Sequence, residues 1–217
     1  MSQNSEPQSV EEEHVEDEEF VDPEVTERRR AALAQIRVFG DPALRTAARD
    51  VVEFDESLST EIARMEGLMS DALGVGLAAT QLGVMHRVLV YRAGADAPLV
   101  AVVNPRLEWS SQEQEVAEEG CLSLPGVIVD VERPLHVRVN AQDEHGDAIR
   151  LEASGLEARV IQHEMDHLDG VLILDRTSRE ERKEALRILR EGPGEDGDSG
   201  GGPSDAPDTE PAEVSRA

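Results

Sequence analysis

The chain has 217 residues and a formal net charge of −26, and only 2% of its residues are aromatic. This length suits one domain with extensions, whose core must be built mainly from Leu, Val, Ile and Ala. The sequence contains no basic patch that would suggest binding to DNA. It also contains no apolar run long enough to span a membrane. The single cysteine, Cys121, cannot form an internal disulfide, so we expect a reducing, cytoplasmic location.

Most of the negative charge lies at the two ends of the chain. Residues 1–27 hold eleven acids and no Lys or Arg, and residues 191–217 hold eight acids with Arg216 as the one base. Acidic or Gly/Pro-rich segments of this kind bury too little apolar surface to offset the entropy cost of folding. We therefore predict a disordered leader over 1–27, a folded domain over 28–190 and a disordered tail over 191–217.

The first strong helix signal follows Asp55 or Ser57, either of which can cap a helix. Next comes a run of small residues, G-V-G-L-A-A-T-Q-L-G (74–83), which cannot begin as a regular helix. In the helix that follows Asp55 or Ser57, the apolar residues recur at helical spacing, which predicts that one side of the helix faces the core. They are Ile62, Met65, Leu68, Met69 and Leu73.

Strand-like segments occupy the middle of the chain, and helices follow them. Ser154 and Glu157 fit a capping box that opens a helix, and Ser178 and Glu181 fit a second one that opens a charged C-terminal helix. Gly170 is placed to end the first of these helices. Strands followed by helices predict an α+β domain with mainly antiparallel sheet. The predicted strands are 87–91, 99–105, 127–131, 136–141 and 148–153.

The helix before Gly170 carries the motif H-E-x-x-H, formed by His163, Glu164 and His167. Positions 156, 160, 163 and 167 share one helix face, so we expect Leu156 to point into the interior with the histidines. Two imidazoles one turn apart can bind one tetrahedral ion, and the glutamate between them can reach a metal-bound water. An exposed histidine pair on a polar helix would give the same pattern by chance.

A catalytic metal site needs a third protein ligand beside the two histidines. A metzincin protease would have a histidine where Ile173 stands, so that pattern fails. A thermolysin-like enzyme would use a downstream glutamate, but Glu180, Glu181 and Glu184 belong to a highly charged, solvated helix. Cys121 remains, and its thiolate would be a strong soft ligand.

Three blocks of the sequence together resemble the peptide deformylases. They are G-V-G-L-A-A-T-Q (74–81), E-G-C-L-S (119–123) and Q-H-E-M-D-H-L-D-G (162–170), in the family's order and at similar intervals. The resemblance implies antiparallel sheets packed around a central H-E-x-x-H helix, with further N- and C-terminal helices. It also implies that 28–190 is the catalytic domain of a metal-dependent hydrolase. The enzyme would remove the formyl group from N-formylmethionyl nascent chains and release formate.

The resemblance implies a role for each residue that matches the family's motifs. Glu164 would be the general base toward a metal-bound water and would then protonate the leaving amine. The side-chain amide of Gln81 and the backbone N–H of Leu122 would stabilise the oxyanion. The ion would be Fe²⁺, with Zn²⁺, Ni²⁺ or Co²⁺ also suited to the ligands. The metal ligands would be Cys121, His163 and His167.

Peptide contacts are also implied by the resemblance. The backbone of Val75 and Gly76 would hydrogen-bond an extended peptide, as the edge of a sheet does. Val160, together with His163, would line the pocket for the methionine side chain. We expect a monomer whose substrates are N-formylmethionyl nascent peptides.

Two further features concern the pocket and the C-terminal helix. Glu119 and Arg133 match a charged pair near the pocket, whereas Arg159 stands where the family often has an apolar residue. In some family members a basic C-terminal helix is associated with ribosome docking. Here the acidic tail would repel ribosomal RNA. The C-terminal helix could still bind it through its basic residues Arg179, Arg182, Lys183, Arg187 and Arg190.

Two alternatives remain at this point. An H-E-x-x-H endopeptidase would keep its metal without Cys121, whereas a deformylase would lose it. A non-enzymatic metal-binding protein would need neither a general base nor an oxyanion donor, so Glu164 and Gln81 argue against it.

Overall fold

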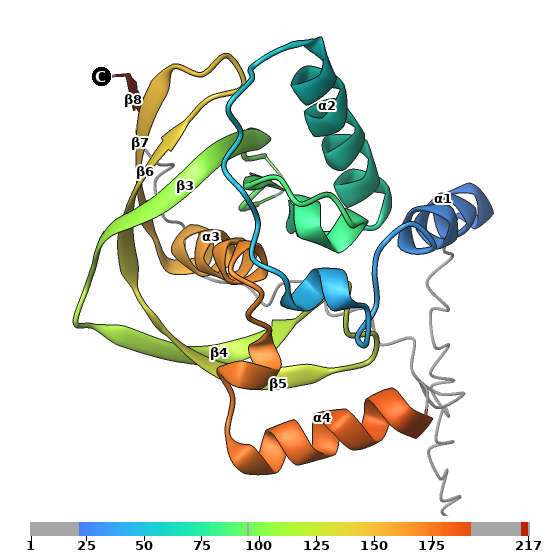
Figure 1. The fold of residues 1–217 in the computed structure, drawn as a ribbon. Helices are drawn as coiled ribbons and strands as arrows, with labels where there is room; N and C mark the ends of the chain where they lie inside the picture. Colours follow the sequence, from blue (N-terminus) through green and yellow to red (C-terminus); the bar gives the residue numbers. More distant parts are fainter. Residues whose placement is uncertain (1–21, 95, 192–213, 217) are drawn as a thin grey trace, which may run out of the picture.

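The computed structural model describes residues 22–94, 96–191 and 214–216. A six-stranded antiparallel sheet has the order β1-β2-β3-β6-β7-β8, and a separate antiparallel pair is formed by β4 and β5 (Figure 1). This architecture confirms the predicted α+β class. The strands are β1 (Gly76–Ala78), β2 (Val88–Tyr91), β3 (Val100–Ser110), β4 (Gln114–Gly120), β5 (Ile128–Pro134), β6 (His136–Gln142), β7 (Ala148–Ser154) and β8 (Val214–Arg216).

One helix, α3, lies in the middle of the molecule between the two sheets (Figure 1). It contacts β1, β2, β6 and β7 of the large sheet and β5 of the small one. Its apolar side chains complete the core with those of the large sheet, so its polar face is held against the β4–β5 pair. The helices are α1 (Pro23–Leu33), α2 (Glu56–Asp71), α3 (Gly155–Leu168) and α4 (Arg179–Glu191), with 3-10 turns at Pro42–Arg45, Ala79–Leu82 and Ile173–Asp175.

The start of α2 was predicted correctly, but its end differs from the prediction. The Asp55 carboxylate accepts hydrogen bonds from the N–H groups of Ser57 (3.0 Å) and Leu58 (3.2 Å), so Asp55 is the cap. The helix ends at Asp71, and Leu73 adopts a left-handed conformation (φ 59°) with 63% of its surface exposed. Leu73 is therefore not a core residue, because the chain has already left the helix.

The five predicted strands are present, with ends that differ by a few residues. The prediction missed β4, whose sequence Q-E-V-A-E-E-G is polar at most positions. Its partner β5 supplies the buried side chains Val129 and Val131 to the third core cluster. The strand therefore forms through pairing with β5 rather than through apolar burial of its own.

The capping boxes had different outcomes. Ser154 precedes α3, but its side chain makes no cap; its Oγ lies 2.8 Å from the Nδ1 of His136, and Glu157 accepts from the Tyr91 hydroxyl (2.9 Å). That predicted box is wrong because both members have tertiary partners. At α4 the Ser178 Oγ accepts from the Glu181 N–H (3.2 Å), as predicted.

Short elements lie within both segments that were predicted to be disordered. Helix α1 begins at Pro23, since the Asp22 carboxylate accepts from the Glu24 N–H (2.9 Å) and proline suits the first helical position. Residues 214–216 form β8, which pairs antiparallel with β7. The prediction was therefore wrong for these residues, while 1–21 and 192–213 lie outside the described residues. No helix in the described residues is long and apolar enough to cross a membrane.

Candidate metal centre

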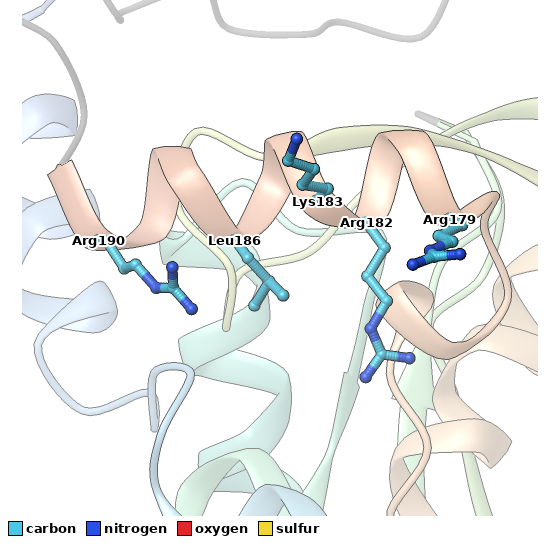
Figure 2. A pocket seen from close by; sticks show the side chains of 5 residues that line it. All are labelled: Arg179, Arg182, Lys183, Leu186 and Arg190. Carbon is cyan, nitrogen blue, oxygen red and sulfur yellow. The ribbon is translucent and has the colours of Figure 1, made fainter.

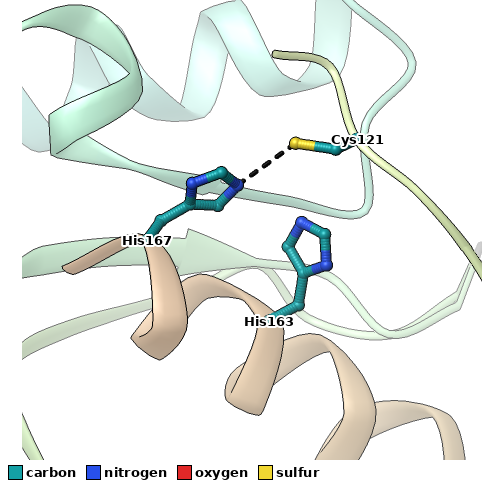
Figure 3. A group of neighbouring side chains, drawn as sticks. All are labelled: Cys121, His163 and His167. Carbon is teal, nitrogen blue, oxygen red and sulfur yellow. Dashed lines mark hydrogen bonds between the residues drawn. The ribbon is translucent and has the colours of Figure 1, made fainter. Parts of the chain in front are cut away.

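Three side chains from two segments converge beside α3 (Figure 3). Cys121 follows directly after β4, and His163 and His167 stand one turn apart on α3. Their ligand atoms all lie within 4.8 Å of one another, and the Cys121 Sγ is 3.2 Å from the His167 Nε2. A thiolate and two imidazoles in this spacing fit a single tetrahedral ion such as Zn²⁺ or Fe²⁺.

The orientation of His163 is set by the carboxylate of Glu119. The His163 Nδ1 lies 2.9 Å from the Glu119 Oε2, which leaves the Nε2 for a metal. Burial raises the pKa of Glu119, but hydrogen bonds from Arg133 and His163 outweigh it and lower the pKa to about 2. Glu119 is therefore a fixed anion, and such carboxylate partners orient histidine ligands and raise their basicity.

Glu164 lies between the two histidines in sequence, and its carboxylate packs against Gly76 of β1. It is buried, and its Oε2 has no hydrogen-bond partner among the described residues. Burial raises its pKa to about 7, partly opposed by His163. A side chain on Gly76 would place its Cβ only 2.4 Å from the Glu164 Oε1. The glycine is therefore required for this carboxylate to occupy its position, and the unpartnered oxygen is available to a ligand.

Gln81 lies opposite α3, in the 3-10 turn Ala79–Leu82. Its Oε1 accepts from the Ala78 N–H (2.9 Å), and its Nε2 donates to the Ser123 Oγ (3.1 Å). The same Nε2 lies 3.8 Å from the Cys121 Sγ, so the amide is fixed beside the metal ligands. The Leu122 backbone N–H has no protein acceptor among the described residues. Both predicted donors are thus near Cys121.

The residues predicted to contact the peptide lie along β1 and α3. Gly76 pairs with Tyr91 of β2, and β1 is an edge strand of its sheet, so its other edge is not paired with a strand. Val75 is 45% exposed beside it, and its carbonyl accepts from the Arg92 N–H (2.8 Å). Val160 is buried in the core cluster with α3. The expected inward position of Leu156 is wrong, since this residue is 37% exposed at the first turn of the helix.

Sequence reasoning missed the number of buried charges around Glu119. Arg133 donates to both oxygens of Glu119 (2.6 and 2.9 Å) and to the Asp166 Oδ2 (2.9 Å). Arg159 is also buried, and its Nη1 donates to the Glu119 Oε1 (2.8 Å). Arg159 and Asp166 are charged residues of the helix that packs between the two sheets, and their burial depends on partners in the β4–β5 pair that the sequence pattern does not reveal.

The glutamates that a thermolysin-like protease would need are not near the histidines. Glu181 accepts from the Asp130 N–H (3.0 Å) and caps α4 with Ser178, and Glu184 pairs with Arg187 on the exposed side of α4. In the described part of the chain, the cluster of potential ligands consists of the cysteine and the two histidines. This geometry does not favour the endopeptidase alternative.

Comparisons with known proteins point to one family. A family model described as polypeptide deformylase matches residues 33–183. The chain is 49% identical to peptide deformylase 1 of Corynebacterium efficiens over 160 residues, which cover 73% of this chain and 95% of that protein. It is 48% identical to the peptide deformylase of Thermotoga neapolitana over 157 residues, which cover 72% of this chain and 92% of that protein.

Solved structures give the same result. The chain superposes on a peptide deformylase from Synechococcus elongatus in complex with actinonin with a TM-score of 0.67 and 44% identity, covering 70% of this chain and 85% of that one. The peptide deformylase of Thermotoga maritima gives a TM-score of 0.64 and 49% identity, with 66% and 96% coverage. The likeness therefore extends to the α+β fold as well as to the sequence.

Proposed function

This chain belongs to the polypeptide deformylase family, and on that premise we propose which of its residues carry out the reaction. It is a metal-dependent hydrolase that removes the N-formyl group from nascent polypeptides. The observation that carries the assignment of residues is the convergence of Cys121, His163 and His167 beside the buried Glu164. We assign the three converging residues as the metal ligands.

The identity of the ion forms the second part of the proposal. A divalent ion at this site would supply Lewis acidity and lower the pKa of a coordinated water from about 15.7 to about 7. Mixed thiolate and imidazole ligands suit Fe²⁺, Zn²⁺, Co²⁺ and Ni²⁺, and the family resemblance favours Fe²⁺. Metal analysis after anaerobic purification tests this, and zinc as the only ion found would contradict it.

Glu164 is the proposed general base and acid. Its buried, unpartnered oxygen supports this role, because a water between the carboxylate and the formyl carbon would be its hydrogen-bond partner. The carboxylate takes the proton from that water as its oxygen attacks the formyl carbon. It then gives the proton to the amine that leaves as the C–N bond breaks, so a free N-terminal amine and formic acid are formed, and the acid ionises to formate in water.

The formyl oxygen needs donors as it gains charge. We assign this role to the Gln81 amide and the Leu122 N–H, which flank Cys121. The peptide would extend β1 through the backbone of Val75 and Gly76, since this strand has one edge without a strand partner. Val160 and His163 would line the pocket for the methionine side chain.

A further proposal concerns where the enzyme works. The single cysteine and the nascent-chain substrate support a cytoplasmic monomer whose catalytic domain spans 28–190. Along α4, a hollow of about 240 Å³ is lined mostly by basic side chains (Figure 2). This surface would dock on ribosomal RNA through phosphate contacts, which are weakened by salt. Its residues are Arg179, Arg182, Lys183, Leu186 and Arg190.

Ribosome docking can be tested separately from catalysis. Replacing Arg179, Arg182 and Arg190 together by serine should abolish co-sedimentation with ribosomes at low salt. Hydrolysis of a free formyl peptide should stay at the level of the natural chain, because these residues lie on α4 and not beside the metal ligands. Undiminished co-sedimentation of the triple variant would contradict the proposed docking surface.

The assignment of the site has a direct test. The chain loaded anaerobically with Fe²⁺ or Zn²⁺ should release formate from formyl-Met-Ala-Ser. The Cys121→Ala variant should lose both the metal and formate release, whereas an endopeptidase using a downstream glutamate would keep its metal. Absence of formate release with both ions would refute the assignment.

A further inference from the structure

Arg159 lies on α3 one turn before His163, and its guanidinium is inside the protein. The residue is 8% exposed, although the family often has an apolar residue at this position. Its Nη1 donates to the Val131 carbonyl (2.9 Å) and to the Glu119 Oε1 (2.8 Å), and its Nη2 donates to the Glu115 carbonyl (2.8 Å). Arg159 therefore joins α3 to both strands of the β4–β5 pair.

The contacts of the Glu119 carboxylate are divided between its two oxygens. Arg133 donates to both, through Nε to Oε1 (2.6 Å) and through Nη2 to Oε2 (2.9 Å). The second contact of each oxygen comes from a residue of α3: Arg159 at Oε1 (2.8 Å) and His163 at Oε2 (2.9 Å). Because residues four apart share a helix face, Arg159 and His163 hold the two oxygens of one carboxylate from the same helix.

This arrangement fixes the carboxylate relative to the helix that carries the metal ligands. Arg133 belongs to β5 and is tied to α3 through Asp166, near the C-terminal end of that helix (2.9 Å). Arg159 adds a second tie from α3, made directly to the Glu119 Oε1 (2.8 Å). The Glu119 Oε2 is thereby kept opposite the His163 Nδ1, which directs the Nε2 of the imidazole toward Cys121.

We propose that Arg159 is a positioning residue for metal binding, which acts through Glu119 on His163. The proposal rests on the assignment of Cys121, His163 and His167 as metal ligands. A residue that only joined α3 to the β4–β5 strands would affect the stability of the fold and leave the metal affinity unchanged. The two roles therefore differ in what a substitution changes.

The test uses two substitutions and a matched control in the full-length chain. Arg159→Met keeps the volume of the side-chain stem and removes every guanidinium contact. Arg159→Lys keeps the charge, but its single nitrogen replaces Nη1 and Nη2, which bond to different acceptors, so the planar fork of contacts is lost. Arg87→Met is the control, because Arg87 is also buried and donates to the Pro105 carbonyl (3.0 Å) and the Asp169 carboxylate (2.6 Å), without touching Glu119.

Two measurements are made on each variant: the Kd for Zn²⁺ by competition with a chromophoric chelator, and the visible spectrum after loading with Co²⁺. Arg159→Met should bind Zn²⁺ about 10- to 100-fold more weakly, as is usual when the partner of a metal-bound histidine is disturbed. The cobalt bands should also change, because the imidazole is no longer held in one orientation. Arg159→Lys should show a smaller loss, and Arg87→Met should match the natural chain in both measurements.

The outcomes separate this proposal from the assignment of the site. Folded Arg159→Met with unchanged Zn²⁺ affinity and cobalt spectrum would overturn it, and so would an equal loss in Arg87→Met. If Arg159→Met does not fold, Arg159→Lys decides, and natural affinity in that variant overturns the proposal. Failure of the ligand assignment is visible independently, since Cys121→Ala would then retain its metal.

Discussion

The two helices α3 and α4 are both rich in charged residues, but they use charge in opposite ways. On α3 the charged side chains Arg159, Glu164 and Asp166 are buried. On α4 Ala185 is the buried residue, and the charged side chains of Glu184 and Arg187 pair on the exposed surface. Burying a charge is costly unless the charge is paired. The buried charges of α3 therefore indicate that the positions of these side chains matter to the chemistry of the site.

The difference also predicts how each helix responds to substitution. Exposed ion pairs such as Arg187–Glu184 typically contribute about 0–1 kcal/mol to stability. Removing one partner of a buried pair, such as Glu119–Arg133, typically costs about 3–5 kcal/mol because the other charge is left without compensation. We therefore expect changes around α3 to lower the free energy of unfolding strongly as well as to affect metal binding and turnover, whereas changes on α4 lower it only slightly.

The largest effect is expected for Glu164→Ala. Removal of the proposed proton carrier should lower kcat by roughly 10²–10⁴-fold, while the three metal ligands remain in place. Formate release and metal content are measured on the same preparation. Glu157→Gln is the matched control on α3, because this carboxylate is bonded to the Tyr91 hydroxyl and not to the metal site. Unchanged formate release in Glu164→Ala would refute the assigned base.

A smaller loss of turnover is expected for Gln81→Met. This change keeps the side-chain length but removes the amide that would donate to the formyl oxygen. Loss of one oxyanion donor typically lowers kcat by about 10²–10³-fold. Steady-state kinetics with formyl-Met-Ala-Ser would show the change in kcat, and a change confined to KM would assign Gln81 to substrate binding alone.

Glu119→Gln should weaken the metal site without removing a ligand. The amide presents an N–H₂ group to donors on Arg133, Arg159 or His163, so at least one of these hydrogen bonds is lost. We expect about 10- to 100-fold weaker Zn²⁺ binding, measured by chelator competition. Metal affinity equal to that of the natural chain would mean that His163 needs no fixed partner.

The smallest effect is expected on α4, for Ser178→Ala. Loss of the cap on the Glu181 N–H should reduce the free energy of unfolding by about 1 kcal/mol, as measured by chemical denaturation. The kcat/KM for a free formyl peptide should be unchanged, because α4 supplies no residue to the metal centre. A fall in kcat/KM would show that the two helices are coupled and would remove the contrast between them.

Local signals explain which parts of the fold could be predicted from sequence. Asp55 caps α2 by bonding to the chain two and three residues later, and Gly170 has a positive φ (72°) just after α3, so both depend on neighbours in sequence. The pattern of apolar and polar residues in the sequence could not reveal β4 or the partners of Ser154. β4 depends on pairing with the next strand, β5, and Ser154 on His136 of the preceding strand, and residue propensities carry no record of such tertiary partners.

The same distinction applies to the candidate site. Cys121, His163 and His167 could be named because thiolate and imidazole are specific chemical signals, and the structure brings them together. The role of Arg159 could not be found, since its partners on β4 and β5 lie 28 and more residues away in the chain. An arginine in the middle of a helix looks like a surface residue until those strands are placed against it.

Cys121 is the chain's single cysteine, and it is a free, partly buried thiol beside the two histidines. Every thiol-directed reagent therefore has one target in this protein, and that target is a proposed metal ligand. A maleimide dye should label the chain slowly when the ion is bound and faster after a chelator has removed it. The protein thus carries an intrinsic reporter of its own metal occupancy, which can be followed in the purified chain without any engineered tag.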